Sequence, residues 1–123
     1  MICLRSVRSW KSGNNTRKEN FFNMKIPKKI RIGGHDIIVD YVDRIPEDKL
    51  GQICLAEGKI TIAKNFLDKK QSETSMVNTF IHEVTHGILD VMDDKLSYNE
   101  KFVSTFSSFL VDVVEEIVKT NKK

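Results

Sequence analysis

The sequence predicts a small α+β domain, in which paired strands over about residues 26–63 are followed by two helices. Two observations lead to this prediction. Between Met24 and Ala63, apolar and polar residues tend to alternate, which is the period of a strand with one buried face. From about residue 72 to residue 118, apolar residues recur every three or four positions, which is the period of an amphipathic helix.

Turn-forming residues divide the strand region into two hairpins. Gly33 and Gly34 separate a strand at 29–32 from a second strand at 35–42. Another hairpin is expected over 52–63, with its turn at Glu57 and Gly58. Because each strand has one apolar side, we expect an antiparallel sheet with one solvated face.

The first helix is expected over about residues 72–92 and the second over about residues 97–118. Ser72 or Thr74 is suited to cap the start of the first helix. We expect one apolar arc of that helix to pack on the sheet; it comprises Val77, Phe80, Ile81, Val84, Ile88 and Val91. The second helix has its own apolar stripe, also expected in the core: Phe102, Phe106, Phe109, Leu110, Val113, Val114 and Ile117.

Charge divides the chain into a basic tail and a nearly neutral domain. Residues 1–23 contain five bases and one acid, show no sustained period and are expected to form a disordered tail. Residues 24–123, the expected single domain, contain fifteen bases and sixteen acids. That domain therefore shows no basic footprint for nucleic acid.

Composition also bears on membranes and compartment. No apolar run approaches the ~20 residues that cross a bilayer, so no membrane association is expected. The chain has two cysteines, Cys3 and Cys54, which is too few for a disulfide framework. We therefore expect reduced thiols and a cytoplasmic protein, whereas the oligomeric state has no signature in the sequence.

The strongest chemical motif is His82-Glu83-Val84-Thr85-His86, the H-E-x-x-H pattern of zinc hydrolases. On a helix, positions i and i+4 are neighbours, so both imidazoles can reach one metal ion. At 100° per residue the two histidines fall outside the apolar arc, which argues against a pair of core histidines. Glu83 lies beside them and could serve as a base toward a zinc-bound water. The alternative is a pair of exposed histidines on a surface helix.

A catalytic zinc takes three protein ligands, so a third is needed. No histidine follows His86, and Asp90 lies about 12 Å along the helix from His82, too far to share its ion. Asp90 could instead orient His86 from behind. Glu100, in the first turn of the second helix, is the best-placed third ligand. However, Ser97-Tyr98-Asn99-Glu100 also fits a capping box, in which Glu100 would bond to the Ser97 backbone N–H.

Two segments together resemble the gluzincin type of metallopeptidase, and more narrowly the ImmA/IrrE family of bacteria and phages. The first runs from Lys59-Ile60-Thr61-Ile62 to the motif at 79–86, and the second is Glu100 to Leu110. The resemblance implies a zincin-like domain with Zn²⁺ held by His82, His86 and Glu100 and with Glu83 as the catalytic base. Members of this family cleave or regulate repressor-type proteins.

These observations predict a zinc-dependent metallopeptidase that hydrolyses a peptide bond in a protein or peptide substrate, such as a phage or mobile-element repressor. Tyr98 could donate a hydrogen bond to the transition state, and the strand at 59–63 could pair with an extended substrate. The alternative is a zincin-like module that recognises a protein partner without cleaving it. A purely structural metal site is disfavoured, because such a site has no use for Glu83 as a base.

Overall fold

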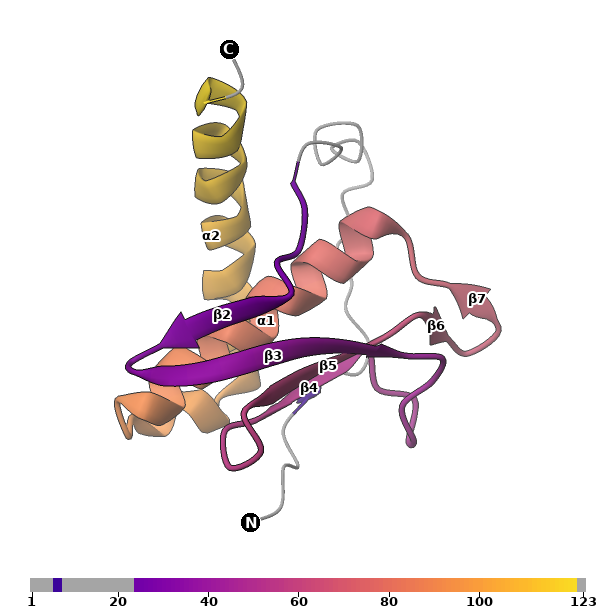
Figure 1. The fold of residues 1–123 in the computed structure, drawn as a ribbon, viewed down its shortest axis with the longest axis horizontal. Coiled ribbons are helices and arrows are strands. Elements are labelled where there is room, and N and C mark those ends of the chain that lie inside the picture. Colours follow the sequence, from indigo (N-terminus) through magenta and orange to yellow (C-terminus); the bar gives the residue numbers. More distant parts are fainter. Residues whose placement is uncertain (1–5, 8–23, 122–123) are drawn as a thin grey trace.

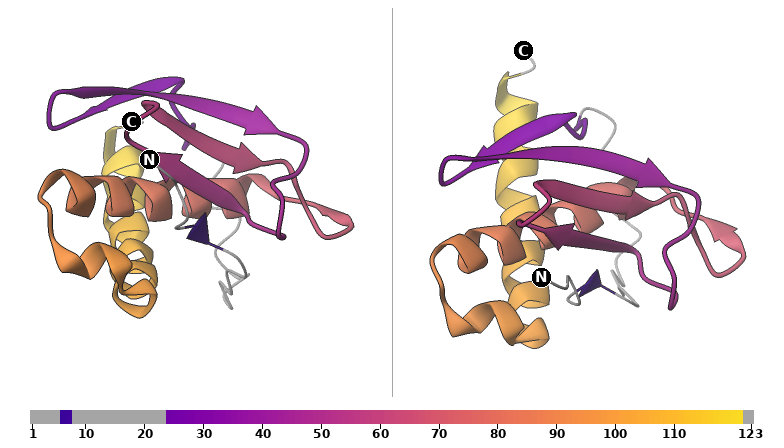
Figure 2. Two further views of the ribbon diagram at one scale, coloured as in Figure 1. Left: turned by 90° about the horizontal axis from the view of Figure 1, so that it is seen from below. Right: turned by 60° about the horizontal axis from the view of Figure 1, so that its bottom comes forward.

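The computed structural model describes residues 6–7 and 24–121, which form a mixed sheet with two helices on one of its faces (Figures 1 and 2). The α+β class predicted from the sequence is confirmed. The five strands of the main sheet are β1 (Ser6–Val7), β2 (Lys29–Ile32), β3 (His35–Val42), β4 (Gly51–Cys54) and β5 (Lys59–Ala63). The other elements are β6 (Asn65–Phe66), β7 (Lys69–Lys70), α1 (Glu73–Val91), the 3₁₀ turn η2 (Lys95–Tyr98) and α2 (Glu100–Asn121).

The sheet is mixed, in the order β1-β4-β5-β3-β2. Both expected hairpins form, β2 with β3 and β4 with β5, and each is antiparallel. However, β3 and β5 run parallel, with Ile38 opposite Lys59 and Val42 opposite Ala63. The expectation of a wholly antiparallel sheet is therefore wrong. Local alternation and turns specify pairing within a hairpin, but not how one hairpin joins another.

The expectation of one solvated face fails for the central strand. In β5, Ile60 and Ile62 are fully buried, and Thr61 and Ala63 on the opposite side are buried as well. Alternation does appear in β3, where Ile37 and Val39 are buried and Ile38 is exposed. The predicted tail at 1–23 lies outside the described residues apart from Ser6–Val7, which pair with β4.

The start of α1 is fixed both by a cap and by a link to the sheet. Ser72 is the N-cap, and its hydroxyl accepts a hydrogen bond from the Ser75 backbone N–H at 3.1 Å. The side chain of Gln71 donates to the Ala63 carbonyl at the end of β5 and accepts from the Thr79 hydroxyl at 2.9 Å. The first turns of α1 are thus hydrogen-bonded to the end of β5.

Further along, α1 comes very close to the sheet at Gly87. A Cβ added there would lie 2.7 Å from Cδ1 of Ile53 and 3.1 Å from Cδ1 of Ile32. Only glycine allows the helix axis this close to β4 and β2 without displacing side chains. This contact fixes how far the following turn of α1 stands from the sheet.

The burial of α1 differs from the single arc that was predicted. Val77, Phe80 and Ile81 are buried in the core, whereas Ile88 is 40% exposed. His82, Glu83 and His86 are fully buried on other sides of the helix. The alternative of exposed histidines is therefore wrong. Because α2 and η2 pack on the side of α1 away from the sheet, the helix is covered on two sides (Figure 2).

In α2 most of the expected core stripe lies on the exposed face, although Leu110 packs against the core as expected. Phe106, Phe109, Val113 and Ile117 are exposed, and the buried side instead carries Val103, Ser107, Val111 and Glu115. The apolar residues of this helix span a wide arc, so periodicity alone does not identify which part of the arc is packed. The smaller side chains of the buried face allow a close approach to α1. The C-terminal half of α2 extends past the sheet (Figures 1 and 2).

Two expectations about environment can be compared with the structure. Cys54 is disulfide-bonded, contrary to the expectation of reduced thiols, and the other half of the bond lies outside the described residues. The expectation of a reducing cytoplasm depended on free thiols, so the bonded Cys54 does not support it. None of the helices in the described residues is long and apolar enough to cross a bilayer.

Candidate metal centre

The candidate ligands come from the middle and second half of α1 and from the first turn of α2. His82 and His86 are one turn apart on α1, and Glu100 is the first residue of α2. Asp93, with a φ of 57°, ends the first helix, and η2 then turns the chain back toward α1. This short connection is what brings Glu100 over the two imidazoles.

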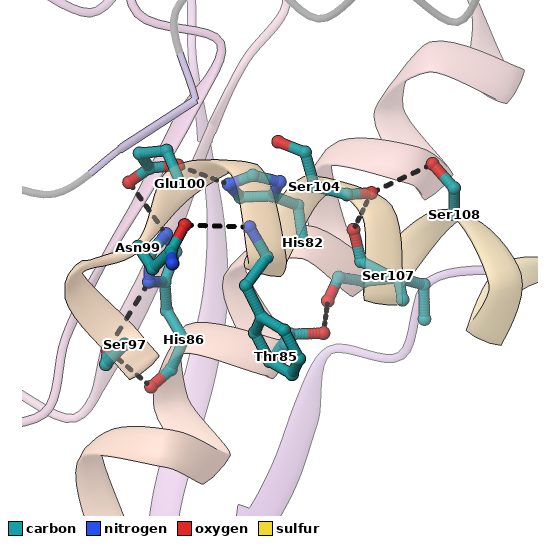
Figure 3. Close-up of polar contacts among 11 residues, drawn as sticks. His82, Thr85, His86, Ser97, Asn99, Glu100, Ser104, Ser107 and Ser108 are labelled. Carbon is teal, nitrogen blue, oxygen red and sulfur yellow. Dashed lines mark hydrogen bonds and ion pairs between the residues drawn. The ribbon is translucent and has the colours of Figure 1, made fainter. Parts of the chain in front are cut away.

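The three side chains converge closely (Figure 3). Glu100 Oε1 lies 3.2 Å from His82 Nε2, and Glu100 Oε2 lies 3.1 Å from His86 Nε2. All three ligand atoms fall within 4.8 Å of one another. Ligand atoms around a tetrahedral zinc with bonds of about 2.05 Å are separated by about 3.3 Å. The donor set and its spacing therefore fit a metal ion.

The two histidines and Glu100 differ in how deeply they are buried. Both imidazoles are fully buried, whereas the Glu100 side chain is 48% exposed. Partial burial by itself raises the pKa of Glu100, but hydrogen bonds and charge from His82 and His86 outweigh it and lower the pKa to about 2. Glu100 is thus an ionised carboxylate on the solvent side of the two imidazoles.

Glu83 is fully buried beside the two histidines, in a space that depends on Gly51 of β4. A Cβ added at Gly51 would lie 2.5 Å from Thr79 Cγ2 and 3.5 Å from Glu83 Cγ. Any side chain there would push into the turn of α1 that carries Glu83. The role of Gly51 was not predicted from the sequence. A glycine just before a strand is common at the end of a loop, so its presence there does not indicate close packing.

A second group missed from the sequence is Ser97, which links His86 to Asp90. Its hydroxyl oxygen faces His86 Nδ1 at 3.4 Å and donates to Asp90 Oδ1 at 2.6 Å. Asp90, which the sequence suggested could orient His86 from behind, is linked to His86 through the Ser97 hydroxyl. With Nε2 turned toward Glu100, this chain of contacts favours a proton on Nδ1 of His86. No periodic signal points to Ser97, because η2 lies outside both helices.

The structure contradicts the capping box. Asn99 caps α2, accepting a hydrogen bond from the Phe102 backbone N–H at 3.0 Å. The Ser97 backbone N–H instead donates to the Asp94 carbonyl at 3.1 Å. The helix begins at Glu100 rather than Ser97, so the Glu100 carboxylate faces the histidines.

Two other sequence-based expectations concern the substrate side. Tyr98 lies in η2 with its side chain 73% exposed, and its role as a transition-state donor stays a prediction. The strand at 59–63, β5, cannot pair with a substrate as expected, because it lies between β4 and β3. An added strand needs an unpaired edge, and both edges of β5 are occupied.

The chain matches no family model, and neither the curated proteins nor the solved structures contain a significantly similar one.

Proposed function

We propose that this protein is a zinc-dependent metallopeptidase of gluzincin type that hydrolyses a peptide bond in a protein substrate. The observation that carries the proposal is the convergence of His82, His86 and Glu100, from two helices, directly beside Glu83. Each of these residues has the chemical type that such a site requires.

The donor set favours a catalytic zinc over other metal sites. Two imidazoles and one carboxylate form a three-ligand set of catalytic zinc, whereas structural zinc sites are closed by four protein ligands. Calcium and magnesium prefer oxygen ligands, which are the minority here. A zinc ion held by these residues would acidify a water molecule and polarise the scissile carbonyl.

Glu83 would transfer a proton from the attacking water to the leaving amine. As the residue after His82 it emerges from the same turn of α1, on the side next to β4, and Gly51 leaves room for it. Its carboxylate would accept the proton of the attacking water and pass it to the leaving amine. Ser97 and Asp90 would hold His86 in the orientation in which Nε2 faces the ion.

The proposed substrate follows from the resemblance to the ImmA/IrrE family. Repressor-type proteins of phages or mobile elements are the substrates that this resemblance suggests.

The test compares the wild-type chain with Glu83→Gln, and Glu116→Gln serves as a matched control on the exposed side of α2. Zinc content and cleavage of a defined peptide library are measured for all three proteins. We expect all three to hold zinc and Glu83→Gln to lose activity by about a thousandfold. Equal cleavage by Glu83→Gln would refute the proposed mechanism. Zinc retention without cleavage by any of the three would support a non-catalytic binding module instead.

A further inference from the structure

The short strand β1 occupies the edge of the sheet that lies beside Glu83. It pairs antiparallel with β4, with Ser6 opposite Gln52 and Val7 opposite Gly51; β1 is the short indigo arrow in Figure 2. The other side of β4 pairs with β5, so β1 closes the edge that β4 would otherwise leave open. β1 also lies close to α1, the helix that carries two of the candidate ligands.

The pairing of Val7 with Gly51 brings the backbone of β1 near Glu83. Gly51 packs against the turn of α1 that carries Glu83, since a Cβ added to this glycine would lie 3.5 Å from Glu83 Cγ. Paired strands are about 4.8 Å apart, so β1 is one strand spacing from the residue that packs on Glu83. The opposite edge of the sheet, β2, is separated from β4 by β5 and β3.

A peptidase must hold the scissile carbonyl of its substrate beside its catalytic base. Main-chain hydrogen bonds to an open strand edge hold an extended peptide in one place and one orientation. The edge of β4 is the one that passes Glu83, and β1 takes it. A substrate strand and β1 therefore cannot pair with β4 at the same time.

A covalent bond at the end of β4 compensates for the shortness of β1. β1 has two residues, and a ladder of that length provides few hydrogen bonds. Cys54, the last residue of β4, is disulfide-bonded. The only other cysteine of the chain is Cys3, three residues before Ser6, and the antiparallel pairing means that the chain enters β1 from the Cys54 end of β4. A disulfide between these two cysteines keeps β1 at a high effective concentration beside its partner strand.

We propose that β1 is an intramolecular inhibitor, which blocks the edge of β4 beside Glu83 until the disulfide at Cys54 is reduced. The inference rests on the proposed peptidase function, because it concerns the regulation of that site. A dithiol transfers two electrons and two protons to the disulfide, which becomes two thiols, while the dithiol itself becomes a disulfide. β1 is then held by its two-residue ladder alone and exchanges with an extended peptide.

The first experiment measures this exchange without cleavage. The probe is a fluorescent peptide of residues 1–12 that carries Cys3→Ser, and its Kd for the full-length Glu83→Gln protein is measured by anisotropy. We expect dithiothreitol to tighten binding by at least about tenfold. It should have no effect on a protein that also carries Cys54→Ala. Equal binding of the probe to oxidised and reduced protein would overturn the proposal.

A second probe tests whether the peptide binds as a strand. It carries Ser6→Pro/Val7→Pro in addition, which removes the backbone N–H groups that a β-ladder needs. We expect this probe to bind the reduced protein at least about tenfold more weakly than the first. If both probes bind equally well, the peptide does not replace β1 on β4, and the proposal is wrong.

The last experiment connects the exchange with cleavage. The peptide library is incubated with zinc-loaded, oxidised wild type and with Cys3→Ser and Cys54→Ala, each of which removes the disulfide. Both variants should cleave at least about tenfold faster than the wild type, and Cys3→Ser does this without altering the buried end of β4. Equal cleavage by all three proteins would overturn inhibition by β1. If none cleaves while the reduced protein still exchanges the probe, the peptidase function fails and the regulation with it, whereas the strand exchange stands.

Discussion

At the first turn of α2, two neighbouring side chains have separable roles. Asn99 accepts the hydrogen bond from the Phe102 N–H that caps the helix, and Glu100 extends toward His82 and His86. The sequence left Glu100 undecided between ligand and cap. Both interpretations placed Glu100 near the start of the helix. The structure decides between them, because α2 begins at Glu100 and is capped by Asn99.

A substitution of Glu100 should therefore lower zinc affinity, whereas a substitution of Asn99 should lower the stability of the helix. Glu100→Ala removes one of three ligands and should lower zinc affinity by at least about a hundredfold, more than loss of an outer-shell partner does. Asn99→Ala should cost about 1 kcal/mol of helix stability and leave zinc bound. Isothermal titration with zinc, combined with urea unfolding, measures both quantities. Zinc retention by Glu100→Ala would show that Glu100 is not a ligand.

The lowered pKa of Glu100 predicts how the chelator-treated protein responds to acid. The folded state holds the carboxylate ionised down to about 2, whereas in the unfolded chain it takes up a proton near 4.5. Its contribution to stability is therefore complete above 4.5 and is lost as the pH falls toward 2. Because the side chain is half-exposed, solvent screening keeps this contribution small.

Urea unfolding of the chelated protein at several acidic pH values measures this dependence. Glu100→Gln should flatten the curve in that window, whereas the control Glu116→Gln should leave the slope unchanged. A chelated wild-type protein with the same slope as Glu100→Gln would contradict the assigned interaction with His82 and His86.

At the scale of elements, the position of α1 decides whether the site exists. Gln71 links the start of the helix to β5, Gly87 allows close contact with Ile53 and Ile32, and Gly51 gives space to Glu83. The sequence predicted both ends of α1 to within a residue, because a cap and a periodic pattern are local signals. The sequence could not reveal the packing roles of Gly51 and Gly87, because these roles depend on which atoms of other elements lie opposite each glycine.

Gly87→Ala tests this contact. In an exposed helix the change stabilises by about 0.5–1 kcal/mol, because alanine is the better helix former. Here the new methyl group would meet Ile53, so we expect a destabilisation of about 1–3 kcal/mol. Thr105→Ala, on the exposed side of α2, is the control and should be neutral or stabilising. Thermal unfolding separates the two results, and a stabilised Gly87→Ala would refute the proposed close packing.

For the whole molecule, the sequence predicted the class, both helices and the grouping of His82, His86 and Glu100, all of which depend on short spacings. It did not predict the parallel pairing of β3 with β5, the outward face of α2 or the bonded state of Cys54. Each of these is a relation between distant segments, for which local periodicity contains no information. The candidate metal centre combines both kinds of information, because a local motif on α1 is completed by a residue from α2.

In the proposed function, His82, His86 and Glu100 hold one zinc ion that ties α1 to α2. The most direct measurement is the zinc content of the purified full chain after dialysis, determined by elemental mass spectrometry beside a His82→Ala/His86→Ala variant. We predict one zinc ion per wild-type chain and none in the variant, with a lower melting temperature when the wild type is chelated. A folded wild-type chain without stoichiometric zinc, or a variant that retains it, would contradict the account.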